Sequence, residues 1–130
     1  QYAVVRANNI FQKLRDRDGV GHAEIAAALP SHPPSALAGD DGADRLWSLV
    51  LDAAKLDEVV DTCIRTLEFA ALAKYAFALA QGFNAVYHAL PVLGEDRESV
   101  RLWRAGALGY VRQQLTAALT TMGIDVPARM

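Results

Sequence analysis

Apolar residues recur at helical spacing along almost the whole chain, and this periodicity limits the fold more than any other feature of the sequence. Side chains three and four positions apart share one face of an α-helix, whereas a half-buried strand alternates apolar and polar residues. No stretch of the sequence sustains that alternation. We therefore predict an all-α chain that folds as an antiparallel helical bundle.

Turn-forming residues set the expected ends of the helices, because glycine adopts left-handed backbone and proline cannot continue a helix. The long helices expected from the apolar rows, each with the residue that ends it, are 1–18 (Gly19), about 72–90 (Pro91) and about 96–122 (Gly123). Because the first of them begins with the chain, we expect either a domain cut from a longer protein or a disordered start before it.

Shorter helical segments complete the bundle. Residues 22–29 are alanine-rich and are expected to form two turns. From Ala43 the apolar pattern predicts two helices that meet near Lys55, with Asp57 as the N-cap of the second. Three prolines and two glycines make residues 30–42 a loop, internal to a single domain that spans residues 1–130.

The composition fits one globular domain without a catalytic centre. The chain has 130 residues, 52% hydrophobic and 22% charged, which suits a single packed core. Its three histidines and Cys63 lack the close spacing of a metal site, and the sequence holds no glycine-rich phosphate loop or nucleophile motif. No apolar run approaches the ~20 residues that span a bilayer. We expect no catalytic residue, metal or cofactor in this chain, and no membrane contact.

Charge is distributed unevenly along the chain. The net charge of −2 hides two basic segments, residues 1–18 and 97–112, on either side of an acidic one. Residues 40–68 carry eight acidic side chains and three basic ones. Such asymmetry indicates a polyanionic partner on one face, and the alternative is a set of solvated helix faces.

Aromatic residues beside basic ones mark the candidate site, because single-stranded RNA stacks its bases on aromatic rings and arginine planes. At helical spacing, Tyr2, Arg6, Asn9 and Lys13 fall in one row. Later in the chain Asn84 and Tyr87 flank an apolar row, where they can reach a groove, whereas Phe83 belongs to the row itself. Arg97, Arg101 and Arg104 share one face of the last helix, as further phosphate contacts or as ordinary surface arginines.

Several of these residues together resemble a known family. They are Gln1-Tyr2-Ala3 with Arg6 and Ile10, Leu67-Glu68, Tyr75, Leu79-Ala80, Phe83-Asn84 with Tyr87, Pro91-Val92-Leu93, Arg101-Leu102, and an ending of the form G-I-x-x-P-x-R-M. Their order along the whole chain is similar to that of the C-terminal anticodon-binding domain of arginyl-tRNA synthetases, called the DALR domain.

The resemblance implies an α-helical bundle of the class I synthetase anticodon-binding type, which binds the anticodon stem-loop of arginine tRNA in the cytoplasm. Arginine-tRNA ligation, with ATP, would occur in a separate catalytic domain of the same polypeptide. The positions matched to the family's anticodon contacts are Tyr2, Arg6 and Met130, and we extend the site to Asn9, Lys13, Phe83, Asn84, Tyr87 and Arg129.

The sequence departs from the family pattern at a few positions. Val4 stands where the family has histidine, Phe69 and Ala70 replace a proline-histidine pair, Ala118 replaces a glycine, and residues 30–42 form an enlarged loop. The alternative is therefore a degenerate or free-standing bundle of this type that acts as a protein-interaction or structural module.

Overall fold

The computed structural model describes residues 1–127, which hold six α-helices, two short 3-10 helices and no strand. The all-α prediction is confirmed for this part of the chain. In chain order the elements are α1 (Tyr2–Asp18), α2 (His22–Ala28), η1 (Leu29–Ser31), η2 (Pro34–Leu37), α3 (Ala43–Ala54), α4 (Leu56–Thr66), α5 (Ala70–Ala89) and α6 (Glu98–Thr121).

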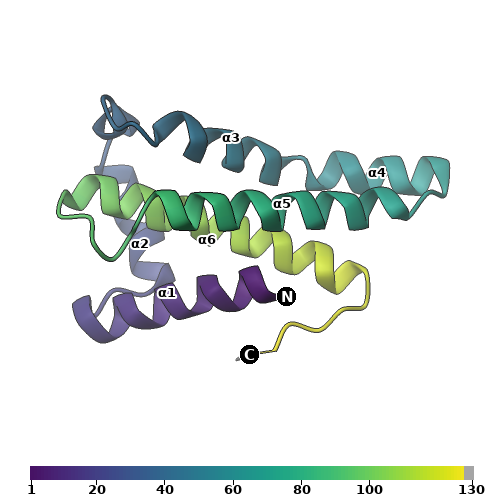
Figure 1. The fold of residues 1–130 in the computed structure, drawn as a ribbon, viewed down its shortest axis with the longest axis horizontal. Helices are drawn as coiled ribbons and strands as arrows, with labels where there is room; N and C mark the ends of the chain where they lie inside the picture. Colours follow the sequence, from purple (N-terminus) through teal and green to yellow (C-terminus); the bar gives the residue numbers. More distant parts are fainter. Residues whose placement is uncertain (128–130) are drawn as a thin grey trace.

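Two long helices, α5 and α6, form the centre of the bundle. Both contact α1 on one side and α3 on the other, while α2 and the 3-10 helices cover α6 and α4 packs on α5. Figure 1 shows α3 and α4 end to end along one edge, with α5 running back beside them and α6 running forward again. The predicted antiparallel bundle is therefore confirmed.

The predicted helix ends agree with the structure. Gly19 and Gly123 are left-handed, with φ of 67° and 73°, and the backbone N–H of Gly19 caps the carbonyl of Arg15. Helix α5 ends at Ala89, and its C-cap Leu90 directly precedes Pro91. The prediction of Asp57 as an N-cap is wrong, because α4 begins at Leu56 and its N-cap is Lys55. Asp57 instead places its charge in the first turn, where the helix dipole favours an acid.

The core lies where the apolar rows predicted it. All four members of the apolar row of α1 (Ala3, Ala7, Ile10 and Leu14) are buried, as are all six of the apolar row that runs from Leu72 along α5 to Leu90. Helix α4 is the exception, since Ile64 and Leu67 remain 66% and 74% exposed. Leu67 follows the last turn of α4 with a left-handed φ of 58°, so it acts as a C-cap rather than as a core residue.

The segment predicted as a loop, residues 30–42, is more ordered than expected. It contains most of η1 and all of η2, both begun with proline in the first positions, where a missing N–H costs nothing. Leu37 and Gly42 are buried, so the segment packs onto the bundle rather than extending from it. Within the described residues, no helix is both long and apolar enough to cross a membrane.

Candidate nucleic-acid interface

The predicted row of α1 lies along the side of the helix that faces α5. Tyr2 is 54% exposed, Asn9 and Lys13 are exposed, and Arg6 is half-buried. The adjoining side of the same helix, with Ala3, Ala7 and Ile10, packs into the core. Burial of this apolar side fixes the rotation of α1, and so it holds the polar row at the surface beside α5.

Arg6 is the centre of the site, because its guanidinium joins the two helices. Its Nη1 donates to the Asn84 Oδ1 at 2.9 Å and lies 3.2 Å from the His88 Nε2. Its Nη2 donates to the Tyr2 hydroxyl at 3.0 Å. A planar guanidinium with several fixed donors suits this arrangement, and the result is a cation held in one place at the surface.

Two tyrosines flank this cation. The Arg6 Cζ lies 4.3 Å from the centre of the Tyr2 ring and 5.3 Å from that of Tyr87, distances within the range of cation–π attraction. The exposed ring of Tyr2 and the half-buried planes of Arg6 and Tyr87 provide stacking surfaces of the kind that unpaired bases use. The pair Tyr2 and Arg6 is thus brought together with Asn84 and Tyr87, although Arg6 and Asn84 are 78 positions apart in sequence.

Phe83 needs a correction, because its side chain is 1% exposed and so cannot touch a ligand at the surface. Its ring packs against the Tyr87 ring, with the centroids 6.2 Å apart and the planes 19° from parallel. Phe83 belongs to the core, as its place in the apolar row indicated, and it supports the Tyr87 ring from the core side. We exclude it from the exposed interface.

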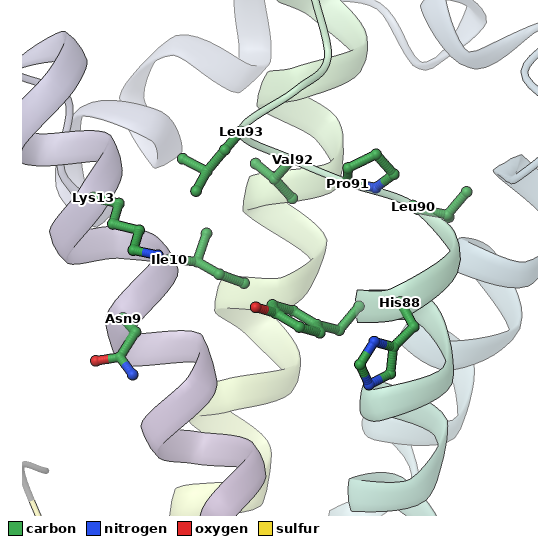
Figure 2. Close-up of a pocket in the computed structure, with 9 residues that line it drawn as sticks. Asn9, Ile10, Lys13, His88, Leu90, Pro91, Val92 and Leu93 are labelled. Atoms are coloured by element: carbon green, nitrogen blue, oxygen red, sulfur yellow. The ribbon is translucent and has the colours of Figure 1, made fainter. Parts of the chain in front are cut away.

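A groove of about 220 Å³ continues the site between α1 and the segment after α5 (Figure 2). Asn9 and Lys13 line it from α1, and His88 lines it from α5. The short run Leu90–Leu93 closes the far side, and we call this run the groove wall. None of the nine lining residues carries a carboxylate, so the only formal charge on the lining is the positive charge of Lys13.

Two of the three arginines considered as further phosphate contacts, Arg97 and Arg104, are paired with carboxylates within the protein. Arg104 is 5% exposed and pairs with Asp40 and Glu95, with N–O distances of 2.8 and 3.0 Å. Arg97 lies before α6 and pairs with the same two carboxylates. Arg101 donates to the backbone carbonyl of Glu95 at 3.0 Å. Asp40 and Glu95 therefore neutralise Arg97 and Arg104, and these two arginines are not free cations for a phosphate.

The carboxyl-terminal segment returns to the beginning of α1. The side-chain amide of Gln1 donates to the backbone carbonyl of Asp125 at 2.7 Å, and Val126 lines the same surface hollow as Val4. The predicted site residues Arg129 and Met130 lie outside the described residues. Residues 125–126 nevertheless bring the described end of the chain to the helix that carries Tyr2.

Two parts of the site were not predicted from the sequence. His88 follows Asn84 by one helical turn and so shares its face, a spacing that could have identified it. The groove wall gives no such spacing signal, because it is not helical and its four residues, one of them a proline, carry no polar side chain. No group of three or more potential metal ligands occurs in residues 1–127.

The fold and the site together define a class of protein. A helical bundle whose exposed face combines tyrosine rings, arginine and lysine beside a groove without acidic residues has the surface chemistry of a nucleic-acid-binding module. The family follows from sequence comparison: residues 1–130 match the DALR anticodon binding domain, and the chain belongs to that family.

Similar curated proteins are arginine–tRNA ligases. The ligase of Methanosarcina acetivorans is 33% identical over 130 residues, covering 100% of this chain and 21% of the ligase. Those of Thermobifida fusca and Ralstonia nicotianae are 34% and 31% identical over 132 and 130 residues, again across 100% of this chain. The chain spans 20% and 21% of those two ligases, or about a fifth of the relatives it matches. No solved structure matches it.

Proposed function

We propose that this chain is a tRNA-binding module that holds the anticodon stem-loop of arginine tRNA. The observation that carries the proposal is the cluster of Tyr2, Arg6, Asn84 and Tyr87 at one exposed site, built from two helices. Membership of the DALR family and the names of the similar ligases support the same assignment. The module would serve a catalytic domain of the same polypeptide, which consumes ATP in the cytoplasm.

The side chains divide the work by their exposure and charge. Arg6 lies over one face of the Tyr2 ring, so an unpaired base stacks on the other face, and the Arg6 guanidinium supplies a positive charge for a phosphate. Lys13, one turn beyond Asn9, supplies a mobile positive charge for a phosphate at the groove. Arg129 and Met130 belong to the same proposal on the strength of the family resemblance.

The distribution of acidic residues supports one RNA-binding face. Six acidic side chains on α3, on α4 and just after α4 are exposed: Asp44, Asp52, Asp57, Glu58, Asp61 and Glu68. Like charges repel the phosphate backbone, so this edge of the bundle disfavours RNA. Anionic RNA is therefore directed towards α1 and α5.

A second candidate function is a protein-interaction or structural module without RNA. It is favoured by exposed apolar side chains on α3, on α4, just before α5 and in the first half of α5, namely Trp47, Leu51, Ile64, Phe69 and Phe77. A basic, apolar protein surface would suit such an edge, since the nearby charges are mostly acidic. Failure of every RNA titration below, with the chain folded, would favour this alternative.

The test is a fluorescence anisotropy titration of the chain with the anticodon stem-loop of arginine tRNA and with a non-cognate stem-loop, each at two salt concentrations. Tyr2→Ala should weaken binding by ~1–3 kcal/mol, the usual value of one lost base stack. The matched control is Phe69→Ala, which removes a ring that is 67% exposed at the distant end of α5. Equal affinities for wild type and Tyr2→Ala would remove Tyr2 from the site.

A further inference from the structure

The groove wall has no regular secondary structure, yet one side of the candidate site depends on it. Its residues, Leu90–Leu93, connect the end of α5 to the loop before α6. Connecting segments of this kind move more easily than helices, because few of their backbone groups are paired within the segment. Something outside the wall must therefore hold it if the groove is to keep its shape.

Arg104 reaches the wall from inside the molecule. Its Nη1 donates to the carbonyl oxygen of Pro91 at 3.0 Å, and the same guanidinium pairs with Asp40 and Glu95. The side chains of Arg104 and Asp40 are 6% and 5% exposed, so the link lies away from solvent. Arg104 thus joins α6, the loop before α3 and the wall at one point.

A second contact braces the wall from the loop that carries Asp40. Gly42 packs so closely on Leu90 that an added Cβ atom would lie 2.1 Å from the Leu90 Cδ2. The backbone N–H of Asp40 donates to Leu37, and its carbonyl accepts from Ala43, so the loop is itself fixed at both ends. The loop therefore packs against Leu90, and Arg104 forms a hydrogen bond with the next residue, Pro91.

The energetics of the ion pair indicate a positional role. Burying charges is costly, and apolar side chains of similar size often stabilise a fold as well or better. Among the described residues, the Arg104 Nε and the Asp40 Oδ2 are buried without a hydrogen-bond partner, so the network is not even fully satisfied. A well-packed apolar side chain could fill this space, but it could not bond to the Pro91 carbonyl.

We propose that Arg104, paired with Asp40, is a positioning residue that fixes the groove wall and thereby sets the shape of the nucleotide-binding groove. The inference rests on the proposed function, because it assigns a specificity role to a residue that touches no RNA itself. Arg104 acts through Pro91 and Leu90, and the groove transmits its effect to the bound nucleotide.

Two measurements on one set of variants test the inference. Arg104→Met replaces the guanidinium with an apolar chain of similar length, and Lys55→Gln is the control, because it removes one positive charge from an exposed pair with Asp52. Hydrogen exchange of the segment 91–97 is measured in the free protein, where the Glu95 N–H donates to the Val92 carbonyl. Stem-loop affinity is then measured at two salt concentrations.

Arg104→Met should raise exchange in the segment 91–97 and weaken stem-loop binding by at least about fivefold, the low end of typical coupling between sites. The salt dependence of binding should not change, because a buried arginine neutralises no phosphate. Lys55→Gln should leave exchange in the segment and the affinity as in wild type. If Arg104→Met does not fold, Asp40→Asn replaces it. This variant should also raise exchange in the segment 91–97 and weaken stem-loop binding, each by a smaller amount.

Unchanged exchange in the segment 91–97 would overturn the claim that Arg104 holds the wall. Faster exchange with unchanged affinity, while Tyr2→Ala loses binding, would overturn the claim that the wall shapes the groove. If wild type itself binds no stem-loop, the proposed function fails and the role in nucleotide binding fails with it. The exchange measurement still shows in that case whether Arg104 holds the wall, so the two failures are distinguishable.

Discussion

At the scale of single residues, the geometry of Arg6 determines what the site can bind. Its guanidinium serves three partners on two helices, Tyr2, Asn84 and His88. A lysine carries the same charge, but it has no planar fork with which to reach all three. Charge and geometry can therefore be separated by experiment.

Arg6→Lys should weaken binding of the anticodon stem-loop and leave its salt dependence unchanged, because one cation remains at the site. Arg6→Gln should weaken binding further and reduce the slope of log K against log salt by about 0.7, the value for one phosphate contact on a single strand. Anisotropy titrations at four salt concentrations measure both quantities. Wild-type affinity in Arg6→Lys would show that the fork does not matter.

Gly42 offers a test of close packing at the base of the groove wall. An added methyl group would collide with the buried Leu90, so Gly42→Ala should lower the free energy of unfolding by about 1–3 kcal/mol, as overpacked cores do. Gly94→Ala is the control, because its Cβ would lie 3.9 Å from the nearest atom, in ordinary contact. Urea unfolding of both variants measures the difference. Equal stabilities would contradict the packing described at Gly42.

At the scale of elements, the helices could be predicted from the sequence because apolar periodicity and helix-ending residues act locally. The apolar rows of α1 and α5 are buried as predicted, and Gly19 and Gly123 end their helices. The burial of Arg104 could not be predicted in this way. Its spacing from Arg97 indicated a shared exposed face, but the carboxylate of Asp40, 64 positions away, makes burial possible.

The candidate site was predictable to the same extent. Tyr2, Arg6, Asn9 and Lys13 share one helix, so spacing alone grouped them. The contact of Arg6 with Asn84 spans 78 positions, and only the packing of α1 on α5 brings the two together. Phe83 was included in the predicted site, but its ring is buried in the core, where it packs against Tyr87.

Helix α4 provides a prediction at this scale through its strained end. Leu67 adopts a left-handed φ of 58°, which costs a residue with a Cβ about 1–2 kcal/mol, and glycine avoids that cost. Glycine loses more backbone entropy on folding, which offsets part of this gain. Leu67→Gly should therefore raise the free energy of unfolding by between 0 and about 1 kcal/mol. The comparison variant Leu51→Gly, in the exposed interior of α3, should destabilise by about 1 kcal/mol. Thermal unfolding that ranks the two variants in the opposite order would contradict this assignment.

At the scale of the whole molecule, the ion-pair network of Asp40, Glu95, Arg97 and Arg104 links the loop before α3 to α6 and to the loop that precedes it. Hydrogen bonds from Arg97, together with the charges of Arg97 and Arg104, lower the pKa of Glu95 from 4.5 to about 2. Burial would raise the pKa of Asp40, but hydrogen bonds from Arg97 and Arg104 and their charges outweigh it, and the pKa is lowered.

The network predicts how stability depends on pH. A carboxylate with a lowered pKa in the folded state stabilises the fold above its unfolded pKa, and this contribution is lost as pH falls towards the folded value. For Glu95 the loss should occur between pH 4.5 and about 2. Urea unfolding across this range should show a decline in stability that is shallower in Glu95→Gln. An identical decline in both proteins would show that Glu95 is not held by the arginines.

The central claim is that one face of the bundle, formed by α1 and α5, binds the anticodon stem-loop. The most direct measurement is the footprint of an arginine tRNA stem-loop on the backbone amide signals of the chain. Shifts should concentrate at residues 2–13 and 84–93 and be absent from the acidic helices α3 and α4. A footprint centred on α3 and α4, or no footprint at saturating RNA, would contradict the account.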